Sequence, residues 1–286
     1  MKHKKLIVLI AACLDAVLIA LSLTLNFNTQ VCFFTAAHSE TSEYSWYFVP
    51  RSDGLQPRDL PEFAFIKGYD AFWVGGAEDK TIYLTFDLGY ENGYTAQILD
   101  VLKNHRAPAA FFVVGHYVKS APELVQRMVS EGHLVCSHSM NHKDMAAISD
   151  FGAFKADLEE LEKTYQELTG KQMPKFFRPP EGRFSERSLK FTEQMGYKTI
   201  FWSFAYKDWY VNDQPSEEDA IKTIITRTHP GAIVLLHATS KTNAAVLDRV
   251  ITQWEDMGYT LKSLDDFPFG SMKQNPGGTK EADAAL

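Results

Sequence analysis

Four side chains that could carry out acid–base or metal chemistry follow apolar runs typical of buried strands. Residues 81–86 form one such run, and the carboxylate of Asp87 follows it directly. His138, Arg178 and His237 follow three later runs of the same kind. In a (β/α) barrel the carboxyl ends of the strands converge on one face. We therefore expect these side chains to form a single site, with Asp87 as its reacting centre.

The spacing of two histidines predicts a metal site. His138 and His142 form an H-x3-H pair, which lets two imidazoles share one ion on a helical turn or across a bend from strand to loop. A lone histidine is more often a packed or surface residue, but the place of this pair at a strand end favours metal binding. Cys136 lies two residues before His138, and we interpret it as a small buried thiol.

Arg178 and His237 have the chemistry that a reacting carboxylate needs beside it. Two prolines follow Arg178 and prevent the segment from continuing as ladder strand or helix, so its guanidinium is presented rigidly enough to orient Asp87. The alternative is an arginine that solvates an ordinary turn. The near-neutral pKa usual for histidine suits His237 for protonating a leaving group. The alternative is a histidine that only packs at a strand end.

The elements that must position these residues alternate between strands and helices. Seven strand-like runs with helical runs between most of them predict an α/β protein, a parallel sheet covered by helices. Seven strands, where a regular barrel has eight, indicate an incomplete or distorted barrel. The expected strands are residues 81–86, 109–114, 133–137, 176–178, 198–203, 232–237 and 260–264, and the expected helices include 121–131, 151–168, 185–195, 217–228 and 243–257.

The two ends of the chain differ from its middle. Residues 1–36 contain basic residues before a long apolar run, which predicts a signal peptide or a signal anchor and hence an exported protein of the cell envelope. Residues 37–79 mix aromatics with Pro, Gly and Asp, which indicates an irregular arm packed on the main domain, with stacking on a sugar as the alternative. The main domain is expected at 80–270 and a disordered tail at 271–286.

Composition limits the classes of partner. The 286 residues are 45% hydrophobic, enough for one large domain with its own core. A net charge of −7 argues against nucleic acid, which needs a basic surface, and nothing in the sequence indicates a protein partner. Only one of the three cysteines lies in the main domain, so no disulfide framework can form within it.

Taken in order, the motifs resemble those of the NodB-type polysaccharide deacetylases, a carbohydrate esterase family that acts on N-acetylated sugars. The resemblance covers residues 81–264. It implies a distorted (β/α)7 barrel, a divalent metal that is usually zinc, and hydrolysis of an N-acetyl amide. The matching segments are T-F-D-L-G at 85–89, H-S-M-N-H at 138–142, R-P-P-E-G at 178–182, D-W at 208–209 and L-L-H at 235–237.

This resemblance also implies a role for each matching residue. Asp87 corresponds to the general base, Arg178 to the partner of that base, and His237 to the general acid that protonates the departing amine. His138 and His142 correspond to the metal ligands. Substrate contacts are implied for Leu235, as the wall of a pocket for the acetyl methyl group, and for Trp209, Tyr90 and Pro180.

Two positions depart from the family pattern. Leu88 stands where the family usually has an aspartate as third metal ligand, so weaker metal binding is expected. An aspartate at this position should restore a ligand, unless Leu88 is packed in the core. Ala205 stands where many members carry an aspartate that orients the catalytic histidine, and the sequence leaves open whether Asp208 takes that role.

Within the family, the chain is most similar to the sporulation-type peptidoglycan N-acetylmuramic acid deacetylases of endospore-forming bacteria, which also lack the second aspartate. Shared segments include residues 81–95, 201–203 and 229–232. The resemblance implies that the partner is the glycan strand of peptidoglycan and that the product leads to the muramic δ-lactam of spore cortex. Two alternatives remain: a deacetylase for N-acetylglucosamine or chitin-type glycans, and a non-catalytic glycan-binding protein that has lost its metal.

Overall fold

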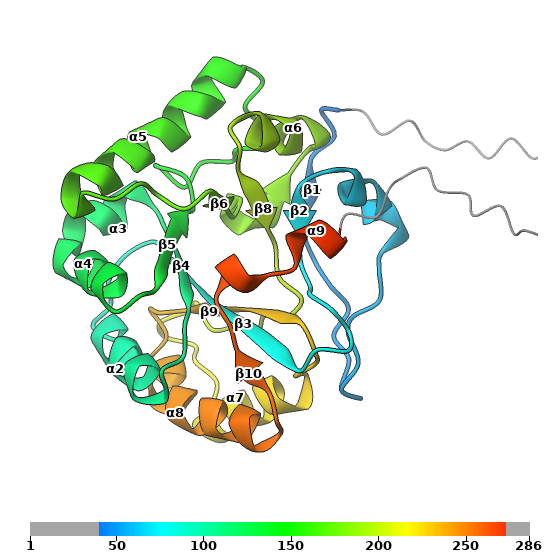
Figure 1. Cartoon of the computed structure of the whole chain (residues 1–286), viewed down its shortest axis with the longest axis vertical. Helices are drawn as coiled ribbons and strands as arrows, with labels where there is room; N and C mark the ends of the chain where they lie inside the picture. The colour runs from blue at the N-terminus through cyan, green and yellow to red at the C-terminus, as the bar shows by residue number, and fades with distance from the viewer. Residues whose placement is uncertain (1–39, 273–286) are drawn as a thin grey trace, which may run out of the picture. The chain divides into compact units, whose positions relative to one another are not determined.

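The structure is a computed structural model that describes residues 40–272. The predicted export segment at residues 1–36 and residues 273–286 of the predicted tail lie outside this range. Within residues 40–272, no helix has both the length and the apolar character needed to cross a membrane. Figure 1 shows a parallel sheet that curls into a half-barrel, with helices along its outer side, so the predicted distorted barrel is confirmed.

Eight strands form the main sheet, and every pairing between them is parallel. All seven expected strands are present. Strand β2 is not among the expected strands, because two residues are too short to show a period. The strands are β2 (Ala71–Phe72), β3 (Thr81–Leu88), β4 (Ala110–Val113), β5 (Leu134–Ser137), β6 (Phe176–Phe177), β8 (Lys198–Ile200), β9 (Ala232–His237) and β10 (Thr260–Leu261).

Strand β3 organises the sheet, because it pairs with β9 over most of its length and with β4 at its carboxyl end. It is two residues longer than the expected 81–86, since Asp87 pairs with His237 of β9 and Leu88 pairs with Val113 of β4. Asp87 therefore lies inside the strand rather than after it. The pairing places the two sequence-predicted acid–base residues side by side on neighbouring strands.

Side chains of β3 alternate between two environments, as they must in any strand. Leu84, Phe86 and Leu88 belong to the large apolar cluster between the sheet and the helices, and Leu88 is 0% exposed. Tyr83 belongs to the smaller cluster on the other face of the sheet. Leu88 consequently points away from the face that carries Asp87.

Four of the helices in the described part of the chain, α5, α6, α7 and α8, begin with a side-chain cap. Asp150 caps the longest one by accepting a hydrogen bond from the Ala153 amide, and Gly170 ends it in the left-handed conformation that glycine adopts readily. The helices are α2 (Thr95–His105), α3 (Gly115–Ser120), α4 (Pro122–Ser130), α5 (Phe151–Thr169), α6 (Glu186–Gln194), α7 (Glu217–Thr226), α8 (Lys241–Asp256) and α9 (Phe269–Met272).

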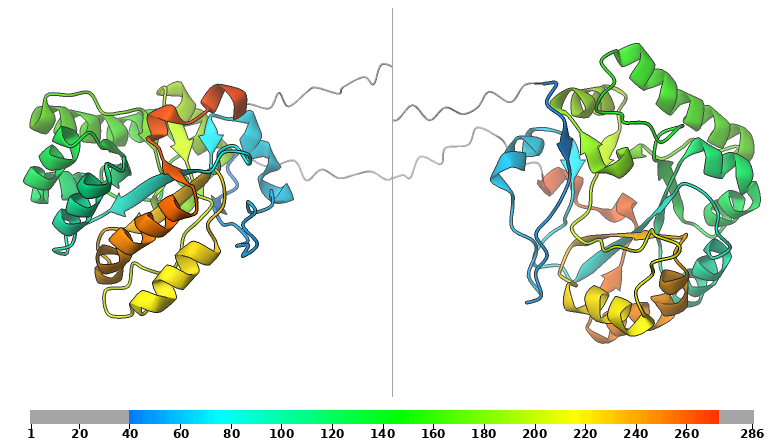
Figure 2. Two further views of the ribbon diagram at one scale, coloured as in Figure 1. Left: turned by 60° about the horizontal axis from the view of Figure 1, so that its bottom comes forward. Right: turned by 180° about the vertical axis from the view of Figure 1, so that it is seen from behind.

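The segment before β3 carries three short elements. Strand β1 (Tyr44–Ser45) pairs with β7 (Arg183–Phe184), a 3-10 helix spans Pro61–Gly68, and β2 joins the sheet beside β8. The buried ring of Trp46 stacks on Phe201 of the barrel with ring centroids 4.7 Å apart. Figure 2 shows this segment in blue along one side of the barrel. Its aromatics therefore anchor it to the barrel.

Candidate active site

Arg178 and Asp87 form a buried ion pair at the carboxyl ends of β6 and β3. The Arg178 side chain is 0% exposed, and its Nη1 lies 2.7 Å from Oδ1 of Asp87. Its other nitrogens donate to the carbonyls of Ile200 and Phe201, and its guanidinium lies 4.2 Å from the centroid of the Phe112 ring. Burial alone would raise the pKa of Asp87, but the positive charge of Arg178 holds it below the usual aspartate value. Asp87 is therefore a carboxylate at neutral pH.

His138 is held in one tautomer beside this pair. Its Nδ1 lies 2.7 Å from the main-chain carbonyl oxygen of Arg178, which can only accept, so Nδ1 carries the proton. The other ring nitrogen, Nε2, is 3.6 Å from Oδ2 of Asp87. Burial lowers the pKa of His138 to about 4 although Asp87 opposes that shift. His138 is thus a neutral imidazole with a free lone pair on Nε2.

His142 is brought next to His138 by an unusual loop. Ser139 and His142 both have positive φ angles, 66° and 52°, and the Ser139 hydroxyl oxygen accepts a hydrogen bond from the His142 amide at 2.9 Å. Backbone strain of this kind is concentrated at functional sites. Asp157 of α5 fixes the loop further by accepting from the Met140 amide at 2.7 Å. The two imidazole centroids are then 5.0 Å apart.

These donors suit a divalent metal, although within residues 40–272 no group of three His, Cys, Asp or Glu side chains forms a complete metal site. A histidine that binds a metal through one nitrogen usually donates its other N–H to a carbonyl or carboxylate, as His138 does. His142 and the carboxylate of Asp87 are its neighbours. Leu88 cannot contribute, because its side chain has no donor atom and lies in the core. The structure thus supplies two imidazoles and one adjacent carboxylate.

His237, the last residue of β9, is paired with Asp208. Asp208 is fully buried, and its Oδ1 lies 2.7 Å from Nδ1 of His237. Its Oδ2 accepts from the His237 amide at 2.8 Å. Burial would lower the pKa of His237, but the carboxylate of Asp208 raises it above the usual histidine value. Asp208 therefore orients His237 and favours its protonated form.

Sequence reasoning missed Asn243, which connects both members of this pair. The side-chain amide of Asn243 donates to Oδ2 of Asp208 at 2.5 Å and to the main-chain carbonyl of His237 at 3.1 Å. The hydroxyl of Tyr206 donates to the amide oxygen of Asn243. Asn243 lies in the first turn of α8, which Ser240 caps. The available signal was a serine and an asparagine three residues apart, directly after the strand that carries His237.

Comparison with known proteins identifies the family. Residues 75–200 match the polysaccharide deacetylase family. The peptidoglycan-N-acetylmuramic acid deacetylase of Bacillus subtilis is 46% identical over 227 residues, which are 79% of this chain and 86% of that protein.

This chain is a polysaccharide deacetylase. Its structure matches the solved structure of that Bacillus subtilis protein, described as a family 4 carbohydrate esterase, with a TM-score of 0.78 and 43% sequence identity. The match covers 81% of this chain and 99% of the other. A chitooligosaccharide deacetylase of Rhizobium leguminosarum bv. trifolii is 37% identical over 58% of this chain and 75% of its own length. The deacetylase is accordingly a hydrolase of N-acetyl amides.

The sequence-predicted substrate residues of the deacetylase fall into two groups. Leu235 and Pro180 are buried. Leu235 precedes His237 by two residues in β9, so both side chains lie on the same face of the sheet. Trp209 and Tyr90 are exposed. The ring of Trp209 lies 5.8 Å from the ring of His237, centroid to centroid. Tyr90 follows the end of β3 by two residues.

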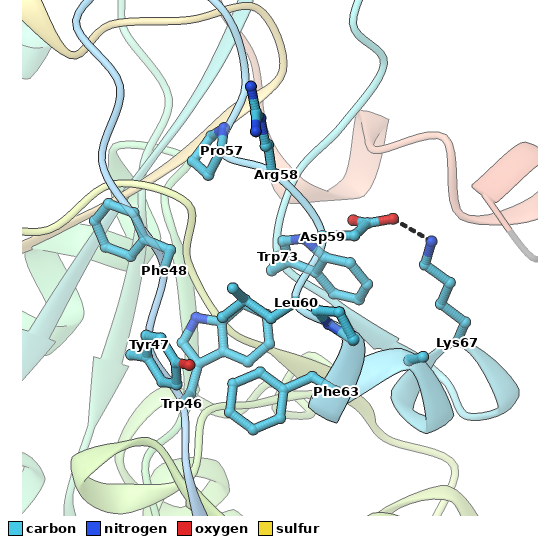
Figure 3. A pocket seen from close by; sticks show the side chains of 12 residues that line it. Trp46, Tyr47, Phe48, Pro57, Arg58, Asp59, Leu60, Phe63, Lys67 and Trp73 are labelled. Carbon is cyan, nitrogen blue, oxygen red and sulfur yellow. Dashed lines mark hydrogen bonds and ion pairs between the residues drawn. The ribbon is translucent and has the colours of Figure 1, made fainter. Parts of the chain in front are cut away.

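A separate cavity of about 190 Å³ lies in the N-terminal segment (Figure 3). Its walls include Trp46, Phe63 and Trp73, and none of the residues that line it belongs to the site around Asp87. The ring of Trp46 stacks on Phe63 as well as on Phe201, so its aromatic surface is already used in packing. The packing interpretation of these aromatics therefore accounts for the buried rings.

Because Leu88 is packed in the core, Leu88→Asp is expected to destabilise the deacetylase rather than to improve its metal site. A buried carboxylate without a partner costs about 3–5 kcal/mol of unfolding free energy. Leu88→Met, which keeps the volume, should cost less than about 1.5 kcal/mol. Urea denaturation measures both changes, and calorimetric titration measures zinc affinity. A folded Leu88→Asp variant that binds zinc more tightly than the wild type would contradict this expectation.

Proposed function

We propose that the deacetylase removes the acetyl group from N-acetylmuramic acid in peptidoglycan, on the route to the muramic δ-lactam of spore cortex. The identity of 46% to a relative with this named activity, over 86% of that relative's length, supports the substrate. The pairing of Asp87 with His237 on neighbouring strands supports the chemistry. One of these groups has a lowered pKa and the other a raised pKa, which separates a base from an acid.

The site residues divide the reaction into two proton transfers. Asp87, ionised and oriented by Arg178, takes a proton from the water that attacks the amide carbonyl. His237, oriented by Asp208, then donates its proton to the nitrogen as the C–N bond breaks, which leaves acetate and a free amine. A divalent metal held by His138 and His142, with zinc as the expected ion, would supply Lewis acidity at the carbonyl.

If His237 is the general acid, Asp208→Asn should move the alkaline limb of the kcat/KM profile to lower pH. The active form needs a protonated His237, so activity is lost as pH rises through the pKa of this group. Asp208 raises that pKa, and an amide of the same shape removes the charge that does so. The profile is measured by acetate release across neutral and alkaline pH.

The matched control for this experiment is Asp248→Asn, the same chemical change at an exposed position of α8. Its profile should overlay that of the wild type. An alkaline limb that stays in place in Asp208→Asn would show that His237 does not supply the proton.

The proposed substrate is tested by acetate release from purified glycan fragments. N-acetylmuramic acid oligosaccharides should release acetate, and the Asp87→Asn variant provides the blank. Acetate released only from N-acetylglucosamine or chitin-type oligosaccharides would support that alternative substrate. Glycan binding without acetate from either series would support a non-catalytic glycan-binding protein.

We also propose that the chain is exported and acts in the cell envelope, where peptidoglycan is found. The basic and apolar composition of residues 1–36 supports this location. Cell fractionation followed by mass determination of the mature protein distinguishes a cleaved signal peptide from a retained anchor. Recovery of the whole chain in the cytoplasm would reject the proposal.

A further inference from the structure

Three consecutive residues beside the active site expose large apolar side chains. Trp209, Tyr210 and Val211 are 46%, 50% and 45% exposed. Consecutive exposed apolar residues have no stabilising value for a soluble domain, and they usually mark a binding surface. Many other aromatic side chains are completely buried, such as Phe201 and Phe204, and the other exposed large apolar residues, Tyr47 and Tyr90 among them, do not form a run of three. The exposure of Trp209, Tyr210 and Val211 therefore indicates a binding surface.

Polar contacts from the same loop hold the backbone at Asp208 and Tyr210 and pack against the Tyr210 ring. The side-chain amide of Gln214 donates to the carbonyls of Asp208 at 2.8 Å and of Tyr210 at 2.6 Å. Lys207 lies 4.7 Å from the centroid of the Tyr210 ring and forms an ion pair with Asp213 at 2.6 Å. A surface fixed in this way loses little conformational entropy when a ligand binds.

The same loop connects this surface directly to the reacting centre. Asp208 binds His237, and the ring of the next residue, Trp209, is 5.8 Å from the His237 ring. The ring of Tyr210 lies a further step along the loop, with its centroid 5.4 Å from that of Trp209. A linear substrate whose reacting sugar lies at His237 therefore has an aromatic surface next to it.

A pyranose ring is the occupant that this surface fits. The apolar C–H face of a sugar ring packs on an aromatic face, while its hydroxyl groups need polar partners at the edge. Lys207, Asp213 and the hydroxyl group of Tyr210 provide such an edge. A purely apolar partner would remove water from these polar groups and offer them no hydrogen bonds in return.

We propose that Tyr210 and Val211 form a second glycan subsite, which binds the sugar next to the one that loses its acetyl group. This inference rests on the proposed function for the identity of the glycan. The subsite makes binding depend on chain length, because a single sugar at His237 does not reach Tyr210 and a longer strand does.

Binding is measured by calorimetry on the full chain in mild detergent, in an Asp87→Asn background that prevents turnover. Replacing Tyr210 by Ala should raise the Kd of a hexasaccharide about 5- to 30-fold, the range expected for the loss of a central aromatic contact. The Kd of the monosaccharide should change much less. Tyr210→Phe keeps the ring and should retain most of the affinity.

The matched control is Tyr47→Ala, since Tyr47 is similarly exposed, at 47%, and lies in the N-terminal segment. An unchanged hexasaccharide Kd in Tyr210→Ala, or an equal loss for both lengths of glycan, overturns the subsite. So does Tyr210-dependent binding of a sugar-free stem peptide. Binding is measured without turnover, so the two proposals can fail separately. If Tyr210→Ala weakens hexasaccharide binding but the wild type releases no acetate, only the proposed function is rejected. If the wild type releases acetate but Tyr210→Ala does not weaken hexasaccharide binding selectively, only the subsite is rejected.

Discussion

Asp87→Asn is expected to lower kcat by about 100- to 10,000-fold, the usual range for loss of a general base. The amide has the shape of the carboxylate and can still accept the hydrogen bond from Arg178, but it cannot take a proton from water. The fold should therefore still form, with a lower stability because the buried Arg178 loses its counter-charge. Acetate release measures turnover, and thermal unfolding with circular dichroism checks the fold.

A comparable carboxylate elsewhere in the chain provides the control. Asp100 also pairs with an arginine, Arg127 at 2.5 Å, but lies exposed on α2. Asp100→Asn should keep kcat within about twofold, since exposed ion pairs contribute little. Turnover by Asp87→Asn within a few-fold of the wild type would reject Asp87 as the base.

Arg178→Met is expected to lower the unfolding free energy by about 3–5 kcal/mol at neutral pH. The substitution leaves the buried carboxylate of Asp87 without its positive partner and removes the stacking on Phe112. Without Arg178, burial should raise the pKa of Asp87 above that of the unfolded chain. Urea denaturation across a pH series measures both effects.

The sign of the pH effect follows from linkage. In the wild type the pKa of Asp87 is lowered by folding, so its contribution to stability is present above the unfolded pKa and is lost as pH falls. In Arg178→Met the unpaired carboxylate of Asp87 destabilises the fold at any pH where it is ionised, and it stops doing so once it is protonated. The difference in stability between the two proteins should therefore narrow toward acid pH.

The double variant Arg178→Met with Asp87→Asn separates charge from packing. Removing the carboxylate should recover part of the stability lost in Arg178→Met, because no buried charge is then left unpaired. Activity should stay absent. A double variant that is less stable than Arg178→Met alone would show that packing, not charge, dominates at this position.

The convergence of Asp87, His138, Arg178 and His237 is predictable from sequence, because each follows or ends an apolar run and parallel strands share one carboxyl edge. The face of the sheet on which the Leu88 side chain lies is not predictable from sequence. It depends on whether β3 ends at Phe86 or continues for two more residues with side chains on alternate faces. That choice is made by pairing with β4, a contact between residues distant in sequence.

The partner of His237 needed the structure for a similar reason. Asp208 lies in a loop without regular secondary structure, and its carboxylate accepts hydrogen bonds from Asn243 of α8 and from the His237 amide. No sequence period specifies such a contact. The short strand β2 escapes prediction because pairing with β8, rather than its own residues, makes it a strand.

Arg178 contributes two separate groups to the site. Its side chain holds Asp87, and its main-chain carbonyl holds the ring of His138. One residue therefore contacts both the carboxylate and the imidazole, so a shift of the Arg178 backbone would disturb both contacts together. A substitution at position 178 removes the side-chain contact with Asp87 and keeps the main-chain carbonyl. The orientation of His138 should therefore survive in variants such as Arg178→Met.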